Sequence, residues 1–229
     1  MKHRRHSPTP PAPGLTSESR DLLEAALEWL GVGSRPGLPD RLAWLAGELA
    51  EWAPRLGLSS IRDANLSLVR HVLDSLLLLK AVEQPSLVVD VGSGAGLPGL
   101  PLALVWPDTR VVAIDGRRRS SWLVTRLAET LSARNLTHLC LRAESPAVVA
   151  EVDQGADLVC AKGLAKVETA VDLCAPLAAP TGEVAILGGP DLDRLPAREG
   201  WRVEVVSLPG TDWRRRILVV RGRASARRE

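Results

Sequence analysis

The sequence of 229 residues contains no phenylalanine and no tyrosine, so its seven tryptophans are its only aromatic side chains. This scarcity argues against a base-stacking platform of the RNA-recognition-motif type, which presents several aromatic rings on a sheet. No apolar run reaches the length of a membrane-spanning helix, and the N-terminus lacks the apolar core of a signal peptide. We therefore expect a cytoplasmic protein without a membrane partner.

Cysteine and histidine are also scarce. The three cysteines (Cys140, Cys160 and Cys174) and the four histidines are too scattered for a disulfide framework or for metal-ligand spacing. We expect reduced thiols and no metal site. The net charge is only +2, so any attraction to nucleic acid must come from local basic clusters. No long apolar stretch demands a partner chain, which favours a monomer.

The length suits one large α/β domain with an extension. The composition, with 45% hydrophobic and 24% charged residues, is ordinary for a globular protein. We expect a disordered basic and proline-rich tail over residues 1–15 and a helical extension over 16–84. The main domain is predicted over 85–222, and a short basic tail over 223–229.

Three amphipathic helices are predicted in the extension. The first is capped by Ser17 or Ser19 and ends near residue 31, and the second covers 39–56. The third begins at Ser60 or Asp63 and continues to about residue 79. Arg70, His71 and Asp74 interrupt its apolar pattern, and we interpret these three residues as a solvated face with Arg70 and Asp74 spaced for mutual support.

Strand and helix patterns alternate in the main domain. Strands are predicted at 87–91, 110–115, 138–142, 156–161, 182–187, 202–207 and 215–221. Helices are predicted between the first five of them, at 97–106, 118–133, 146–151 and 166–178. This alternation indicates a parallel sheet with helices on both faces. The short connection between the last two strands predicts an antiparallel hairpin at the sheet edge.

The most informative stretch follows the first of these strands and reads Asp90-Val-Gly-Ser-Gly-Ala-Gly. The alternating Gly92, Gly94 and Gly96 allow a tight turn and let a ligand approach the backbone without meeting a side chain. The N-terminus of the following helix offers unpaired N–H groups. The stretch therefore predicts a cradle for a nucleotide or cofactor, although a glycine turn that only packs a helix on a strand is the alternative.

Spacing distinguishes between the cofactors. Leu97 stands where the dinucleotide fingerprint G-x-G-x-x-G requires its third glycine, which disfavours a nicotinamide dehydrogenase. The pattern D-x-G-x-G-x-G instead resembles the first motif of class I S-adenosylmethionine-dependent methyltransferases. That motif needs an acidic residue at the end of the second strand to hold the ribose hydroxyls, and Asp115 ends the segment RVVAID.

Several segments together resemble the bacterial small-subunit rRNA guanine-N7 methyltransferases, the RsmG or GidB (glucose-inhibited division protein B) family. They are LSSIRD-x6-RHVLDSLLLL (58–79), VVDVGSGAGLPGLPLAL (88–104), Arg142-Ala143-Glu144, Asp157-Leu158-Val159 and RRRILVV (214–220). The resemblance covers roughly residues 20–221. It implies the Rossmann-like class I methyltransferase fold, an α/β fold with seven mostly parallel strands and a reversed last strand, preceded by an N-terminal helical extension.

The resemblance also implies an activity: methyl transfer from S-adenosyl-L-methionine to N7 of one guanine in the decoding region of 16S rRNA, in naked rRNA or in a 30S particle. Residue by residue, it implies cofactor contacts from Asp90, Gly92, Gly94, Gly96, Leu97, Asp115, Ala143 and Glu144. Lys162 stands where the family has an arginine that faces cofactor and substrate, so Lys162 is the catalytic and a cofactor-binding candidate. Guanine N7 carries a free lone pair, so the reaction needs alignment rather than a general base.

Local basic clusters are the candidates for contacts with RNA phosphates. They are Arg70 and His71; Arg117, Arg118 and Arg119; and Arg214, Arg215 and Arg216. The second cluster is favoured because it follows Asp115, at the cofactor end of the sheet. For each cluster the alternative is a solvated face, and the third cluster could equally protect an edge strand from aggregation.

Four departures from the family pattern lie on the expected substrate side. Gly57 replaces an asparagine, Lys162 replaces an arginine, Gly188 replaces a lysine, and the segment from Asp115 to Trp122 is one residue shorter. Lysine keeps the charge of arginine but loses its bidentate fork. These departures motivate two alternatives: a methyltransferase acting on another RNA or a small molecule, and a non-catalytic ribosome-associated protein.

Overall fold

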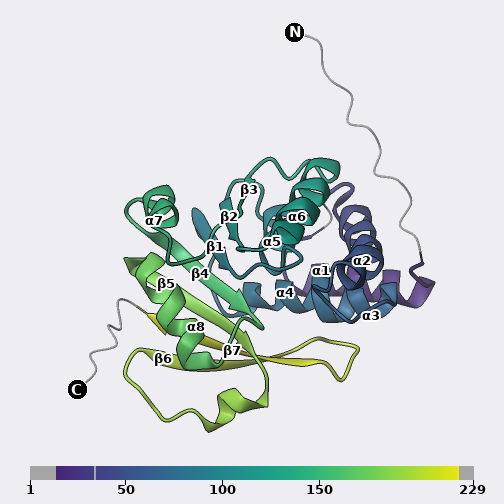
Figure 1. Cartoon of the computed structure of the whole chain (residues 1–229). Coiled ribbons are helices and arrows are strands. Elements are labelled where there is room, and N and C mark those ends of the chain that lie inside the picture. Colours follow the sequence, from purple (N-terminus) through teal and green to yellow (C-terminus); the bar gives the residue numbers. More distant parts are fainter. Residues whose placement is uncertain (1–13, 34, 222–229) are drawn as a thin grey trace.

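The computed structural model describes residues 14–33 and 35–221 (Figure 1). The predicted tails lie outside this part of the chain, apart from residues 14 and 15. Within the described residues, no helix is both long and apolar enough to cross a membrane. The N-terminal helices pack beside an α/β sheet and share one apolar cluster with it, and the division predicted at residue 84 stays a prediction.

The first two helices of the extension follow the predicted pattern. Helix α1 covers Ser17–Trp29. The predicted cap at Ser17 or Ser19 is wrong, because the cap is Thr16, whose hydroxyl accepts a hydrogen bond from the Ser19 N–H at 3.3 Å. Helix α2 covers Leu38–Arg55 and begins after Gly37, whose φ of 76° suits glycine. Helix α1 packs on α2 within the extension, and α2 also packs on α5 (Gly99–Val105) of the main domain.

The third predicted helix is broken into four short segments. They are α3 (Ala64–Ser67), the π-helical turn η1 (Leu68–Leu73), α4 (Asp74–Leu76) and the 3₁₀ turn η2 (Leu77–Lys80). Asp63 caps α3 by accepting a hydrogen bond from the Leu66 N–H at 2.7 Å, as predicted. The wider π turn shifts the helical register, and such turns often accompany functional sites. The prediction of a solvated polar face is wrong for Asp74, which is completely buried.

The sheet has seven strands, as predicted. They are β1 (Leu87–Val91), β2 (Arg110–Ile114), β3 (Leu136–Leu139), β4 (Ala156–Lys162), β5 (Ala178–Gly188), β6 (Trp201–Ser207) and β7 (Arg214–Arg221). Their order is β3-β2-β1-β4-β5-β7-β6, and β7 runs antiparallel to both of its neighbours. The predicted hairpin is therefore confirmed, with β6 at the edge and β7 inserted between β5 and β6. The third strand ends at Leu139 rather than residue 142, because its pairing with β2 ends there.

Helices cover both faces of the sheet (Figure 1). Helices α5 (Gly99–Val105) and α6 (Arg118–Thr130) lie on the face that also carries the N-terminal extension. The other face carries α7 (Pro146–Val152), α8 (Val167–Cys174) and the 3₁₀ turns η3 (Ala175–Leu177) and η4 (Pro190–Arg194).

The central strands are buried on both sides, which explains their continuous apolar runs. In β1, Val88 packs into the cluster of the first face and Val89 into that of the second. The chain order reverses between β1 and β4, so loops from opposite directions leave a crevice at the carboxyl ends of these strands. In open α/β sheets this switch point is where ligands bind.

Candidate active site

The glycine loop begins where β1 ends. Gly92, Gly94 and Gly96 all have φ between +57° and +88°, a region that side chains other than glycine rarely adopt. The Ser93 N–H donates to the carbonyl of Ile114 at 3.0 Å, which ties the loop to β2. A Cβ atom placed on Gly92 would clash with the side chain of Leu164. The loop therefore accepts only glycine at its first turn.

Asp90 fixes the other side of this loop. Its side chain is fully buried, and its Oδ2 accepts a hydrogen bond from the Gly99 N–H, the first residue of α5, at 2.8 Å. Burial raises the pKa of this carboxyl to about 7. Its Oδ1 has no hydrogen-bond partner within residues 14–33 and 35–221. One of the expected free N–H groups of α5 is thus already used inside the protein.

Asp115 follows β2 and also holds the loop. Its Oδ2 accepts hydrogen bonds from the Gly94 N–H at 3.0 Å and from Arg117 Nη2 at 2.7 Å. Its Oδ1 accepts from the backbone N–H and the Nε of Arg117, both at 2.9 Å. Burial favours the neutral acid, but these bonds outweigh it and hold the pKa of Asp115 below its usual value.

A cavity of about 450 Å³ opens at the carboxyl ends of β1, β2 and β4. It brings together four of the predicted cofactor residues, which are Gly92, Asp115, Ala143 and Glu144. The remaining predicted loop residues, Asp90, Gly94, Gly96 and Leu97, shape the turn and do not line this cavity. Leu164 lines it too and was not predicted, although its position directly after a predicted strand end was the available signal.

A second cavity, of about 670 Å³, adjoins the first at the ends of β4 and β5. Gly163 and Leu164 line both cavities, whereas Lys162, Gly188 and Arg215 line only the second. A larger open cavity of about 1030 Å³ lies at the opposite end of the parallel strands, beside the points where β1 and β4 begin. It is remote from the glycine loop, so the two adjoining cavities form the candidate site.

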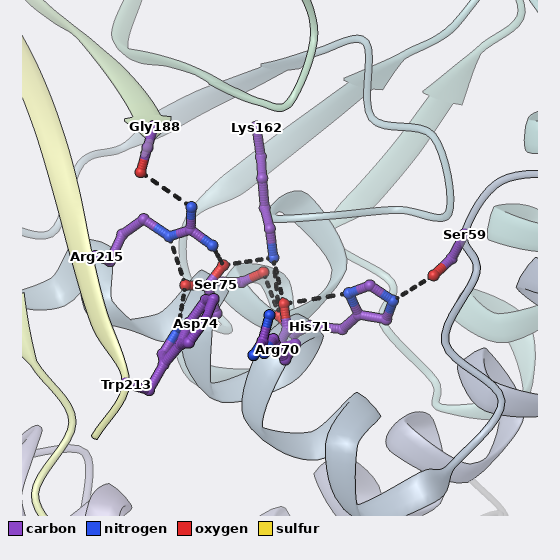
Figure 2. Close-up of polar contacts among 9 residues, drawn as sticks. All are labelled: Ser59, Arg70, His71, Asp74, Ser75, Lys162, Gly188, Trp213 and Arg215. Atoms are coloured by element: carbon purple, nitrogen blue, oxygen red, sulfur yellow. Dashed lines mark hydrogen bonds and ion pairs between the residues drawn. The ribbon is translucent and has the colours of Figure 1, made fainter. Parts of the chain in front are cut away.

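Asp74 is the centre of the polar cluster beside the second cavity (Figure 2). Its Oδ1 accepts hydrogen bonds from Arg215 Nε at 2.6 Å and from Trp213 Nε1 at 2.8 Å. Its Oδ2 accepts from Arg215 Nη2 at 2.6 Å and forms an ion pair with Lys162 Nζ at 2.7 Å. Burial alone would raise the pKa of Asp74, but the two cations lower it below its usual value. This set of four residues is called the Asp74 cluster below.

The ammonium of Lys162 is held on several sides. Besides Asp74, it contacts the carbonyl oxygens of Arg70 at 3.0 Å and His71 at 3.5 Å (Figure 2). Its side chain is only 14% exposed, and burial lowers its pKa although Asp74 opposes this. The guanidinium of Arg70 lies 4.1 Å from the centre of the Trp213 ring, a cation–π distance. The extension thus contributes directly to the site.

Comparison with known proteins identifies the family. A model described as GidB, rRNA small subunit methyltransferase G, matches residues 39–195. The chain is 31% identical to ribosomal RNA small subunit methyltransferase G of Roseiflexus sp. (strain RS-1), over 87% of this chain and 90% of that protein. It is 30% identical to the protein of the same name from Ralstonia nicotianae, over 89% of this chain and 96% of that protein. This chain belongs to the rRNA small subunit methyltransferase G family.

The chain is accordingly an S-adenosylmethionine-dependent methyltransferase of the RsmG family. Its fold agrees with that of a solved structure, a predicted O-methyltransferase from Agrobacterium tumefaciens. The TM-score is 0.52 at 16% identity, over 65% of this chain and 79% of the other. That likeness concerns the methyltransferase fold alone.

The basic residues predicted to contact RNA in this RsmG-family protein differ in their exposure to solvent. Arg70, Arg117, Arg118, Arg119 and Arg214 are exposed, whereas His71, Arg215 and Arg216 are partly buried. Arg216 pairs with Asp193, and Arg215 belongs to the Asp74 cluster. Strand β7 starts beside the carboxyl end of β5. Arg214 therefore lies at the same end of the sheet as Arg118 and Arg119, which begin α6.

His71 is sequestered beside Lys162. Its Nε2 lies 2.8 Å from the hydroxyl of Ser59, and its carbonyl accepts a hydrogen bond from the Ser75 hydroxyl at 2.6 Å (Figure 2). Burial and the nearby charge of Lys162 lower the pKa of His71 to about 4. The imidazole is therefore neutral near pH 7.

Proposed function

We propose that this protein transfers a methyl group from S-adenosyl-L-methionine to N7 of a guanine in the decoding region of 16S rRNA, acting in the cytoplasm as a monomer. One observation carries the proposal within the RsmG family: two adjoining cavities share Gly163 and Leu164. The cavity beside the glycine loop would hold the cofactor. The cavity beside Lys162 and Arg215 would hold the guanine.

The residues of the first cavity fit the cofactor. Gly92 keeps the loop free of a side chain, and Asp115 offers a buried carboxylate suited to ribose hydroxyls. Ala143 and Glu144 line the side on which the adenine would lie. The buried Oδ1 of Asp90, unpartnered in the described part of the chain, is an acceptor at the base of the same loop.

When bound, S-adenosyl-L-methionine supplies an electrophilic sulfonium methyl group. Guanine N7 needs no deprotonation, so the protein has to align the base, exclude water and prevent charge repulsion. Lysine or arginine can recognise the acceptors on this edge of guanine, and Lys162 and Arg215 line the second cavity. The base would have to leave its stack to reach a cavity of this kind.

Asp74 would have a charge-balancing part in this reaction. Guanine gains positive charge when its N7 is methylated, and two unpaired cations beside it would oppose this gain. Asp74 contacts both Lys162 and Arg215 and leaves the cluster with a single net positive charge. We assign Lys162 to orientation of the guanine rather than to proton transfer, because its ammonium already donates to Asp74 and the Arg70 carbonyl.

Exposed arginines would bind the RNA backbone. Arg118 and Arg119 begin α6 at the cofactor end of the sheet. Arg70 lies in η1 of the extension, and Arg214 begins β7 directly before Arg215, which lines the second cavity. Arginine forms bidentate bonds with phosphate, and each such contact makes binding salt-dependent. Arg117 and Arg215 would contribute from positions where they also contact protein groups, whereas the neutral His71 would add no charge to this surface.

The decisive experiment incubates the purified protein with tritiated S-adenosylmethionine and 30S particles that lack their native guanine-N7 mark. We expect label at N7 of one decoding-region guanine, and naked 16S rRNA in parallel tests which form is the substrate. Particles from marked cells are the control and should take up no label. Tight cofactor binding without label would mean that the substrate side has diverged toward another RNA or a small molecule.

A further inference from the structure

The carboxylate of Asp115 is fully engaged within the protein. Arg117 supplies three of its four hydrogen bonds: one from the backbone and two from the guanidinium, whose Nε and Nη2 face Oδ1 and Oδ2 at 2.9 and 2.7 Å. The Gly94 N–H supplies the fourth, at 3.0 Å. Two carboxylate oxygens offer about four lone-pair sites, so no acceptor site remains for another donor.

The guanidinium also lies above the glycine loop. A Cβ atom on Gly94 would be 3.6 Å from Arg117 Nη2, which places this cation at both the loop and the acidic residue. A ribose diol presents two adjacent O–H donors, as the guanidinium presents two adjacent N–H donors. Both would therefore use the same face of the Asp115 carboxylate, and they cannot use it together.

Arg117 is free to leave this position, whereas Asp115 is not. The side chain of Arg117 is 46% exposed, but that of Asp115 is only 4% exposed. The backbone N–H groups of Gly94 and Arg117 keep the carboxylate in place after the guanidinium departs. The guanidinium is thus half solvated while the carboxylate stays buried, so water can replace part of what Arg117 loses on leaving, and the two backbone donors remain on Asp115.

A released Arg117 would stand beside two further cations. Arg118 and Arg119 are exposed, and neither has a carboxylate partner within residues 14–33 and 35–221. Three consecutive arginines, of which Arg117 lines the cofactor cavity, favour a polyanion, and phosphate accepts the same fork that Asp115 accepts.

We propose that Arg117 occupies the ribose-binding face of Asp115 in the free protein and transfers to an RNA phosphate when the cofactor displaces it. This inference rests on the proposed function, because it takes S-adenosylmethionine and RNA as the two ligands. Each ligand then favours the other: the cofactor releases a cation for RNA, and RNA removes a competitor of the ribose. Such coupling is necessarily reciprocal.

The test measures binding, with S-adenosylhomocysteine as the non-reacting cofactor analogue and a labelled 16S rRNA fragment. In calorimetry, Arg117→Ala should bind the analogue roughly two- to fivefold more tightly than the unmodified protein, the size of a half-exposed ion pair. In the unmodified protein, saturating analogue should tighten RNA binding by a similar factor. In Arg117→Ala this enhancement should vanish.

Two further variants separate competition from charge. Arg118→Ala is the matched control: it should weaken RNA binding but leave the analogue's affinity and the enhancement unchanged. Arg117→Lys keeps the cation but loses the fork, so it should bind the analogue more tightly and still bind RNA. Weaker analogue binding by Arg117→Ala, or an enhancement that persists in it, would overturn the proposal. Methylation of 30S particles, measured separately, reports on the proposed function alone.

Discussion

The Nζ atom of Lys162 lies 2.7 Å from Oδ2 of Asp74, a carboxylate with no exposed surface (Figure 2). The pair joins the helical extension to the strand that ends at the candidate active site. Arg215 adds a second cation from β7. Three elements distant in sequence therefore meet at one carboxylate, and removing that carboxylate should affect both stability and turnover.

Asp74→Asn should strongly destabilise the fold. The substitution leaves two buried cations without their counter-charge, and breaking such a network typically costs on the order of 3 kcal/mol. Urea unfolding followed by circular dichroism would measure the change. The control is Asp193→Asn, which removes an exposed partner of Arg216 and should leave the unfolding midpoint nearly unchanged. Equal midpoints for the two variants would contradict the central role of Asp74.

Lys162→Ala should fold but lose most of its turnover. Asp74 keeps Arg215 and Trp213 as partners, so the buried carboxylate stays paired when the lysine is removed. With cofactor and 30S particles at saturation, we expect the methylation rate to fall by more than tenfold, equivalent to about 1.4 kcal/mol in the barrier. Lys162→Arg, which restores the charge, should recover part of the rate. An unchanged rate in Lys162→Ala would limit this lysine to a structural role.

Gly92→Val should abolish binding of S-adenosylmethionine. A valine here faces a φ of 69° and the side chain of Leu164, so the loop must distort at the cofactor cavity. Calorimetry measures the loss of affinity. Gly33→Val is a matched control, because Gly33 has a φ of 53° and open space around it. Native affinity in Gly92→Val would mean that this loop does not bind the cofactor.

Between about pH 6.5 and about pH 4, His71 should lower the free energy of unfolding relative to a variant that lacks its imidazole. The folded protein lowers the pKa of His71 from the usual 6.5 to about 4, so the unfolded chain binds the proton first. This stability is complete above pH 6.5 and is lost as the pH falls toward 4, by at most about 3 kcal/mol. Urea titrations at pH 7.5 and 5 measure the loss.

His71→Gln tests the origin of this dependence. Glutamine can still bond to Ser59 but does not titrate, so at pH 5 the variant should retain more of its pH 7.5 stability than the unmodified protein does. An identical change between pH 7.5 and pH 5 in the two proteins would assign the dependence to groups other than His71. The buried Asp90 adds the same opposite contribution to both proteins, because its raised pKa favours the folded state at lower pH.

The sequence by itself determined the features that depend on neighbouring residues. The alternating glycines, the apolar strands and the position of Asp115 follow from local backbone rules and strand periodicity, and the seven-stranded fold confirmed them. The cap at Asp63 was equally local. Resemblance to the RsmG family rested on the same contiguous segments, and the family match agrees with it.

Only the tertiary structure decided which charges are buried and with what they pair. Asp74 looked like one polar residue on a solvated helix, because no local pattern shows that a π turn and two distant strands enclose it. Arg215 and Arg117 looked like members of basic clusters, yet each binds a buried carboxylate. Burial of a charge depends on the packing of the whole fold, and sequence spacing carries no information about a partner as distant in the chain as Asp74 is from Arg215.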